Sequence, residues 1–115
     1  MSRSLVLYLD DIIGSCAKVQ RYLQGMALSD FMADERTFDA VVRNLEIIGE
    51  AAKQVPQDTR DRYPNIEWRK LAGLRDILAH AYFSLESEIL WDVAVNKLPD
   101  LQQQVEQIRR ETALD

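Results

Sequence analysis

The 115 residues of this chain match the size of one typical domain, which holds on the order of 100–150 residues, so we expect a single domain over residues 1–115. Hydrophobic residues make up 47% and charged residues 29% of the chain, a balance that excludes an intrinsically disordered protein. The net charge of −5 does not indicate a nucleic-acid binder, because contacts to phosphate require Lys and Arg.

The charge is unevenly distributed along the chain. Residues 60–80 carry a net charge of +2, whereas residues 84–115 carry a net charge of −4. The middle of the chain could therefore face a polyanion that the C-terminal part repels. Scattered, solvated charges are the simpler interpretation, and composition alone favours it.

The sequence gives no sign of secretion or of a membrane anchor. Cys16 is the only cysteine, so no internal disulfide can form. Asp10 and Asp11 interrupt the apolar run that starts at Leu5, and neither a signal peptide nor a membrane span is visible. We therefore expect a cytoplasmic protein.

In the first segment, apolar residues recur at alternating spacings of four and three, which predicts a helix with one buried face. These residues are Leu5, Leu9, Ile12, Cys16, Val19, Leu23 and Met26. Because Cys16 belongs to this set, we expect it to be a core thiol rather than a nucleophile.

After a polar connection, the same spacing returns from Phe38 to Val55, together with a second apolar face. We expect this helix to be central, or to be shared between the core and a partner subunit. Gly49 costs roughly 1 kcal/mol of helix propensity relative to Ala, which indicates close packing at that position. Pro56 ends the helix, and Pro64 ends the short polar turn that follows.

Four charged residues lie on one side of this predicted helix. Glu46 and Glu50 are four residues apart and repel each other, and Arg43 and Lys53 could offset the cost. We interpret the four residues as an ion network at the edge of the core rather than as a catalytic acid pair.

Three more helices are predicted downstream. One runs from Glu67 to about Ala81; the next has Ser84 as its N-cap and continues through Asn96; Pro99 fits the first turn of a fifth helix. No segment shows the period-two alternation of a strand. Helices joined by short loops predict an all-α fold, an antiparallel bundle of four or five helices.

The chemistry available to this chain is limited, because His80 is its only histidine. A zinc site would need more ligands than His80 and Cys16, which lie on different predicted helices. The Glu-x-x-His pairs of a di-iron bundle, a Gly-rich phosphate loop and a nucleophile elbow are all absent from the sequence. We therefore expect no metal and no cofactor, which leaves metal-free acid–base chemistry or binding alone.

Arg75, His80 and Tyr82 form the most informative group of residues. At about 100° per residue, positions 75 and 82 share a helix face, whereas positions 75 and 80 lie about 140° apart. For Arg75 and His80 to act on one phosphate within one chain, the helix must loosen or end near His80. Alternatively, two copies of the chain could bring the Arg and His groups together across a symmetry axis.

The pattern Arg75-x-x-x-x-His80-x-Tyr82 resembles the signature of HepT-like toxins in the HEPN superfamily, where four to six residues separate Arg and His. A polar residue directly after the Arg is usual in that superfamily, and Asp76 occupies this place. Further strings resemble the same group, so that the similarity spans nearly the whole chain. They are Arg43-Asn44-Leu45-Glu46-Ile47-Ile48-Gly49-Glu50-Ala51-Ala52-Lys53, Tyr63-Pro64, Trp68-Arg69-Lys70 and Trp91-Asp92.

The resemblance implies a HEPN-like bundle that acts as a metal-independent endoribonuclease toxin. RNA carries its own nucleophile, the ribose 2′-hydroxyl, so the protein need only move protons and stabilise charge. His80 can take or give a proton near neutral pH, and Arg75 can donate to the phosphate oxygens as charge develops on them. Asp76 could orient either side chain or could simply face water.

The resemblance also implies partners for the chain. Cleavage needs both an acid and a base, so a homodimer that places two His80 side chains in one cleft would supply what one chain lacks. The second implied partner is a minimal nucleotidyltransferase antitoxin of the MntA-like kind. In the family, this enzyme adds AMP to the tyrosine that corresponds to Tyr82, and a bulky anion beside Arg75 would block the site for RNA phosphate.

Two other functions remain open from the sequence. The chain could be a non-catalytic HEPN module that binds a nucleotide or protein and restrains a toxic nucleotidyltransferase, which would reverse the roles. It could also be a purely structural helical partner, because a lone His on a helix is more often structural than catalytic and Arg75 could merely cover the core with its aliphatic stem.

Overall fold

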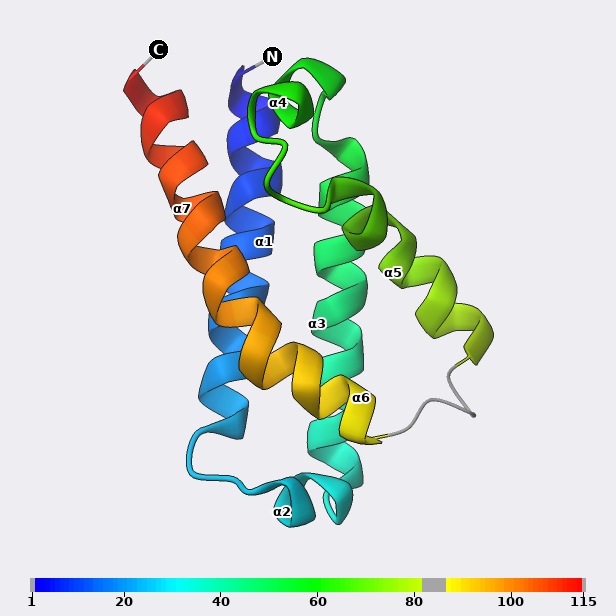
Figure 1. Ribbon diagram of the computed structural model, residues 1–115. Helices are drawn as coiled ribbons and strands as arrows, with labels where there is room; N and C mark the ends of the chain where they lie inside the picture. Colours follow the sequence, from blue (N-terminus) through cyan, green and yellow to red (C-terminus); the bar gives the residue numbers. More distant parts are fainter. Residues whose placement is uncertain (1, 82–86, 115) are drawn as a thin grey trace.

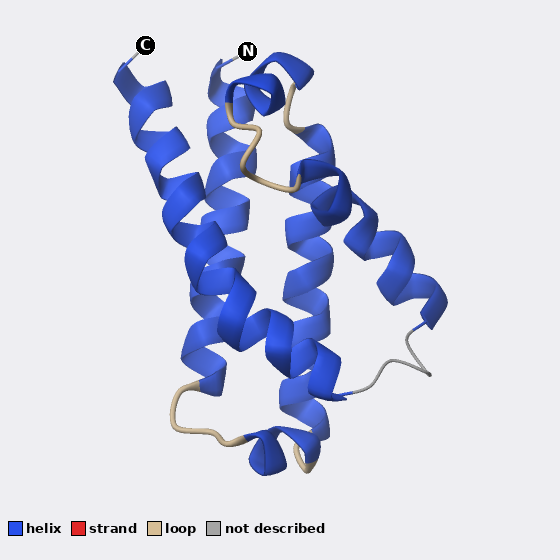
Figure 2. Cartoon of the chain, viewed as in Figure 1, coloured by secondary structure: helices blue, strands red, loops and turns tan. Residues whose placement is uncertain are grey.

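The computed structural model describes residues 2–81 and 87–114, and their side chains except at 2–4, 77, 79–81 and 113–114. Every regular element in these ranges is helical (Figures 1 and 2), which confirms the all-α bundle predicted from the sequence. The elements are α1 (Ser2–Leu23), α2 (Leu28–Met32), α3 (Glu35–Gln54), α4 (Gln57–Arg62), α5 (Trp68–Ala81), α6 (Ser87–Asp92), a π-helical segment (Val93–Lys97) and α7 (Leu98–Leu114). No helix among the described residues is long and apolar enough to cross a membrane.

The bundle is built around α3, which lies between α1 and α5 (Figure 1). Helix α7 packs along α1, and α6 with the π-helical segment joins α7 to the α2 end of the bundle. The long helices alternate in direction along the chain, as expected for an antiparallel bundle. The expectation that the second long helix is central is confirmed, whereas α5 makes its main contacts with α3 alone.

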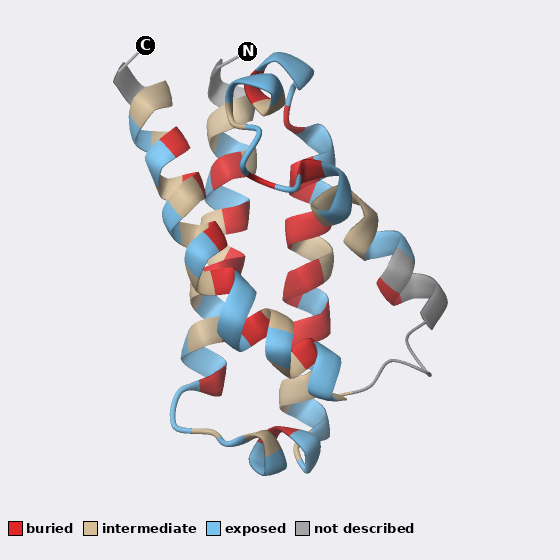
Figure 3. Ribbon diagram, in the orientation of Figure 1, coloured by how far each residue is buried: buried red, intermediate tan, exposed pale blue. Residues whose placement is uncertain are grey.

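The core forms where the apolar faces of α1, α3 and α7 meet (Figure 3), because burial of these faces is the main driving force for packing helices together. Leu9, Ile12, Cys16, Val19 and Leu23 of the predicted stripe on α1 are all buried. The corresponding buried residues of α3 are Val41, Leu45, Ile48 and Ala52, and those of α7 are Leu101, Val105 and Ile108. The core role predicted for Cys16 is therefore confirmed.

Two connections that we expected to be irregular contain short helices. The polar connection after α1 includes α2, which forms because Phe31 is buried and its ring packs against those of Phe38 and Trp91, with centroid separations of 5.9 and 5.6 Å. The polar turn after Pro56 is α4 (Gln57–Arg62). In both places a few tertiary contacts fold a segment whose composition is that of a loop.

The fourth and fifth predicted helices are not separated by a loop, which corrects the expectation from the sequence. Helix α6 continues into the π-helical segment, where the N–H of Leu98 donates to the carbonyl of Val93, and α7 begins directly afterwards. Pro99, which has no N–H and disfavours a regular helix before it, lies in the first turn of α7 as expected. The N-cap predicted at Ser84 lies outside the described residues.

Both ends of α3 are fixed by side chains. At the N-terminus, the carboxylate of Asp34 accepts hydrogen bonds from the N–H of Thr37 at 3.0 Å and from its hydroxyl at 2.7 Å. At the C-terminus, the guanidinium of Arg60 donates to the carbonyls of Ala52, Lys53 and Val55 at 2.8 to 3.0 Å. The central helix is thereby capped at both ends.

Candidate functional site

Helix α5 carries the three candidate residues that lie within the described part of the chain: Arg75, Asp76 and His80. The helix is continuous from Trp68 to Ala81, the last described residue before 87, so it does not break between Arg75 and His80. Positions 75 and 80 therefore keep the separation of about 140° around the helix axis that regular geometry imposes. The side chain of His80 is not described, and Tyr82, the candidate for modification, lies outside the described residues.

The backbone of Arg75 lies directly on Gly49 of α3. A Cβ atom placed on Gly49 would be 3.0 Å from the carbonyl oxygen of Leu71, 3.1 Å from the backbone nitrogen of Arg75 and 3.3 Å from the Cβ of Leu74. Because two of these neighbours are backbone atoms, a side chain at Gly49 would force α5 to shift by a few tenths of an ångström. The close packing that the sequence predicts at Gly49 is therefore confirmed, and its partner is the turn of α5 that holds Arg75.

The side chain of Arg75 lies on the surface, 59% exposed, with its Nη1 atom 3.7 Å from Oε2 of Glu50. This separation is too long for a hydrogen bond, so the contact is one of charge. Glu50 is itself 50% exposed, and exposed pairs of this kind contribute at most about 1 kcal/mol to stability. The guanidinium has five N–H donors, so it can still bind an anion from the solvent side.

The ion network expected along α3 is not what the structure shows. Arg43 and Lys53 are exposed, and none of the ion pairs formed by the described residues joins Arg43, Glu46, Glu50 and Lys53 to one another. Glu50 instead pairs with Arg75 of α5. Sequence spacing identifies neighbours on one helix, but it does not reveal a partner on another helix, which is why this contact was missed.

Asp76 is exposed on α5, next to Arg75 in the sequence. Helical geometry turns it about 100° away from Arg75 around the axis. The roles considered for it from the sequence stay predictions.

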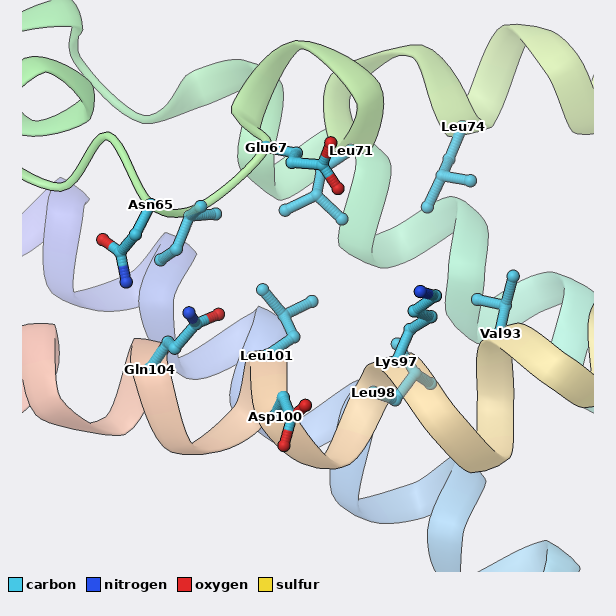
Figure 4. A pocket seen from close by; sticks show the side chains of 11 residues that line it. Asn65, Glu67, Leu71, Leu74, Val93, Lys97, Leu98, Asp100, Leu101 and Gln104 are labelled. Atoms are coloured by element: carbon cyan, nitrogen blue, oxygen red, sulfur yellow. The ribbon is translucent and has the colours of Figure 1, made fainter.

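A cleft of about 250 Å³ lies between α5 and the start of α7, and Arg75 does not line it. Leu71 and Leu74 point into this cleft from α5, opposite Lys97, Leu98 and Leu101 (Figure 4). Both leucines are only partly buried, because α5 rests on α3 and leans away from α7. The helix that carries the candidate residues is therefore covered on one side only.

Two other kinds of site find no support among the described residues. Burial, and secondarily the negative charge of Glu106, raises the pKa of the Cys16 thiol to about 12, so this thiol stays protonated and is unsuited to act as a nucleophile. In the described part of the chain, no group of three His, Cys, Asp or Glu side chains is placed to hold a metal ion.

An all-helical bundle that presents an exposed arginine on the same helix as its only histidine has the features expected of a HEPN protein. A family model described as Ribonuclease HepT-like matches residues 12–108, so the chain belongs to this family. Membership confirms the family predicted from the sequence motifs. Because the family is one of ribonucleases, it also confirms the class of enzyme that the sequence predicts.

Relatives from several organisms match over most of the chain. A protein of Thermococcus cleftensis named "Probable ribonuclease HepT" is 38% identical over 110 residues, which cover 96% of this chain and 100% of that protein. One of Methanocaldococcus jannaschii, named as a putative RNase, is 39% identical over 88% of this chain and 84% of its own length. A protein with a similar name from Caldanaerobacter subterraneus subsp. tengcongensis is 37% identical over 88% and 90%, respectively. No solved structure matches the chain.

Proposed function

We propose that this chain is a metal-independent endoribonuclease toxin of a toxin–antitoxin system, acting on RNA in the cytoplasm with Arg75 and His80 as its catalytic residues. The observation that carries the proposal is the exposed guanidinium of Arg75, which lies on the helix of the only histidine in a chain of the HepT-like ribonuclease family. Asp76 is the supporting residue beside Arg75.

The chemistry follows from what these two side chains can do. The ribose 2′-hydroxyl attacks the adjacent phosphorus, the bond to the 5′-oxygen breaks, and a 2′,3′-cyclic phosphate is left on the upstream fragment. His80 moves a proton from the attacking hydroxyl or to the leaving oxygen. Arg75 donates to the non-bridging oxygens, on which negative charge increases in the transition state.

A homodimer is the form in which we expect the chain to work. The continuity of α5 supports this, because an unbroken helix separates positions 75 and 80 by about 140° and disfavours their joint action on one phosphate within one chain. Analytical ultracentrifugation across a range of concentrations tests this point, and a fully active monomer would contradict it.

The direct test of the proposal uses purified protein and a defined RNA in the presence of EDTA. We expect cleavage with a 2′,3′-cyclic phosphate product, and a loss of about 100-fold or more for His80→Ala and for Arg75→Ala. The matched control is Arg69→Ala, which removes another exposed arginine of α5 and should cleave at the parent rate. Unchanged cleavage by His80→Ala would exclude the catalytic role of the histidine.

Growth of cells provides a second test. Expression of the chain should arrest bacterial growth, and Arg75→Ala should relieve the arrest while it still folds, because the residue is largely exposed. If the folded protein binds a nucleotidyltransferase but never cleaves RNA, the chain is a non-catalytic binding module, and the roles of toxin and antitoxin are reversed.

We further propose that an MntA-like minimal nucleotidyltransferase is the antitoxin and that it silences the toxin by adding AMP to Tyr82. Tyr82 follows Arg75 by seven residues, a spacing that returns to the same side of a helix. Mass spectrometry after co-expression should find the added AMP on Tyr82, and Tyr82→Phe, which keeps the ring but lacks the acceptor hydroxyl, should stay unmodified and toxic. An inhibited but unmodified toxin would indicate inhibition by binding alone.

A further inference from the structure

The contact between Glu50 and Arg75 joins α3 to the helix that carries the proposed catalytic residues. We propose that Glu50 is a positioning residue for Arg75: its carboxylate holds the guanidinium next to α3 and leaves the remaining N–H groups oriented toward the RNA phosphate. This inference rests on the proposed ribonuclease function and deepens it, because it assigns a role to a residue outside the Arg–His motif.

Two consecutive residues of α3 contact the two ends of Arg75. A Cβ on Gly49 would lie 3.1 Å from the backbone nitrogen of Arg75, so the absence of a side chain at this position sets the distance between the two helices. Glu50, the next residue, has its carboxylate 3.7 Å from the guanidinium of Arg75. The backbone and the tip of Arg75 are therefore both located relative to the same turn of α3.

A positioning contact is needed here because a free arginine side chain has many conformations. An exposed arginine has four rotatable side-chain bonds, and ordering it at the moment of substrate binding costs conformational entropy. A carboxylate on the neighbouring helix restricts these conformations before RNA arrives. Because the contact engages Nη1 at a distance beyond that of a hydrogen bond, donors of the guanidinium stay available for the phosphate.

The carboxylate of Glu50 favours catalysis by ordering Arg75, but it weakens the binding of RNA. A negative charge close to the phosphate-binding group repels the RNA backbone, so its removal should strengthen binding. Glu50 is therefore expected to increase kcat and to increase KM as well. A residue that only stabilises the fold would not change the two constants in this way, so the split between them is the diagnostic result.

The experiment measures kcat and KM separately on one defined RNA for the parent, Glu50→Gln and Glu50→Asp. Glu50 is 50% exposed, so Gln keeps its shape and removes its charge without opening a cavity. For Glu50→Gln we expect kcat to fall about fivefold, the range open to a half-exposed ion pair, while KM also falls. Glu50→Asp keeps the charge and should recover part of kcat.

Glu46→Gln is the matched control. Glu46 lies four residues before Glu50 on α3, and no ion pair involving it is formed among the described residues. Both variants remove one negative charge, so a general effect of net charge on RNA binding appears in both. Glu46 is less exposed than Glu50 but has no ion pair with Arg75, so Glu46→Gln should keep the kcat of the parent.

Equal kcat values for Glu50→Gln and Glu46→Gln would overturn the positioning role and leave the ribonuclease proposal intact. A parent protein that does not cleave RNA would instead refute the ribonuclease proposal. The positioning role then has a readout independent of catalysis: NMR order parameters of the Arg75 Nε–H group should fall in Glu50→Gln and not in Glu46→Gln. Equal order parameters in all three proteins would overturn it.

Discussion

Replacing Gly49 by Ala tests whether the distance between α3 and α5 controls the position of Arg75. The added methyl group would lie 3.0 Å from the carbonyl oxygen of Leu71 and 3.1 Å from the backbone nitrogen of Arg75, whereas ordinary contacts begin at 3.4 Å. Both neighbours are backbone atoms, so no side chain can rotate away. Helix α5 as a whole has to retreat by a few tenths of an ångström.

The change in stability is the sum of two opposing contributions. Overpacking of a close contact costs about 1–3 kcal/mol, whereas Ala in place of Gly within a helix gains roughly 1 kcal/mol. We therefore expect Gly49→Ala to lower the free energy of unfolding by about 0–2 kcal/mol. The rate of RNA cleavage should fall several-fold, because a displacement of about 1 Å of a catalytic group can cost on the order of 100-fold.

Gly14→Ala separates these contributions. Gly14 also lies within a long helix, α1, but a Cβ on it would meet no atom within 4 Å. This variant should therefore show only the gain in helix propensity, roughly 1 kcal/mol. The difference between the two variants, about 1–3 kcal/mol, reports the overpacking at the contact of α3 with α5.

Stability is measured by urea unfolding at one fixed protein concentration, because the stability of a dimer depends on concentration. RNA cleavage is measured under the conditions used for the catalytic variants. The reasoning is refuted if Gly49→Ala gains as much stability as Gly14→Ala and cleaves RNA at the parent rate. If Gly49→Ala loses stability but cleaves RNA at the parent rate, the steric contact at Gly49 is confirmed, but the contact does not control the position of Arg75.

Two further predictions concern residues that fix the bundle. Because burial raises the pKa of the Cys16 thiol to about 12, iodoacetamide should modify it at pH 8 only after the protein unfolds; rapid modification of the folded protein would show that the helices open locally at α1. The backbone N–H of Thr37, followed by its hydroxyl, holds the pKa of Asp34 below its ordinary value of 3.8. This N-cap therefore stabilises the fold above that pH and stops doing so as the pH falls through the lowered pKa; Asp34→Asn should flatten the stability profile in this acidic range, and an unchanged profile would contradict the assignment.

The long helices could be predicted because the helical spacing of their apolar residues is visible within each segment, without any knowledge of its tertiary contacts. The stripe from Leu9 to Leu23 and that from Val41 to Val55 are buried as expected, since burial of such faces is the dominant contribution to folding. Helix α2 was missed because Phe31 acquires its partners, Phe38 and Trp91, only in the folded chain.

The candidate site could be predicted as a set of residues but not as an arrangement. The motif placed Arg75 and His80 on one helix, and the close packing expected from Gly49 exists. The ion pair with Glu50 depends on how α3 and α5 cross, and no spacing along the chain encodes that crossing. The reading of Glu50 as part of a network within its own helix was wrong for this reason.

The π-helical segment between α6 and α7 has a consequence for comparing this chain with its relatives. A π-turn accommodates one residue more than the corresponding α-turn, so a relative with a regular helix at this place would be one residue shorter between Val93 and Lys97. If the extra residue were instead kept in a regular α-helix, α6 would be rotated by about 100° with respect to α7. Leu90, now 2% exposed, would then turn out of the core. The wide π-turn thus takes up the extra residue and keeps α6 in the rotational phase that buries Leu90.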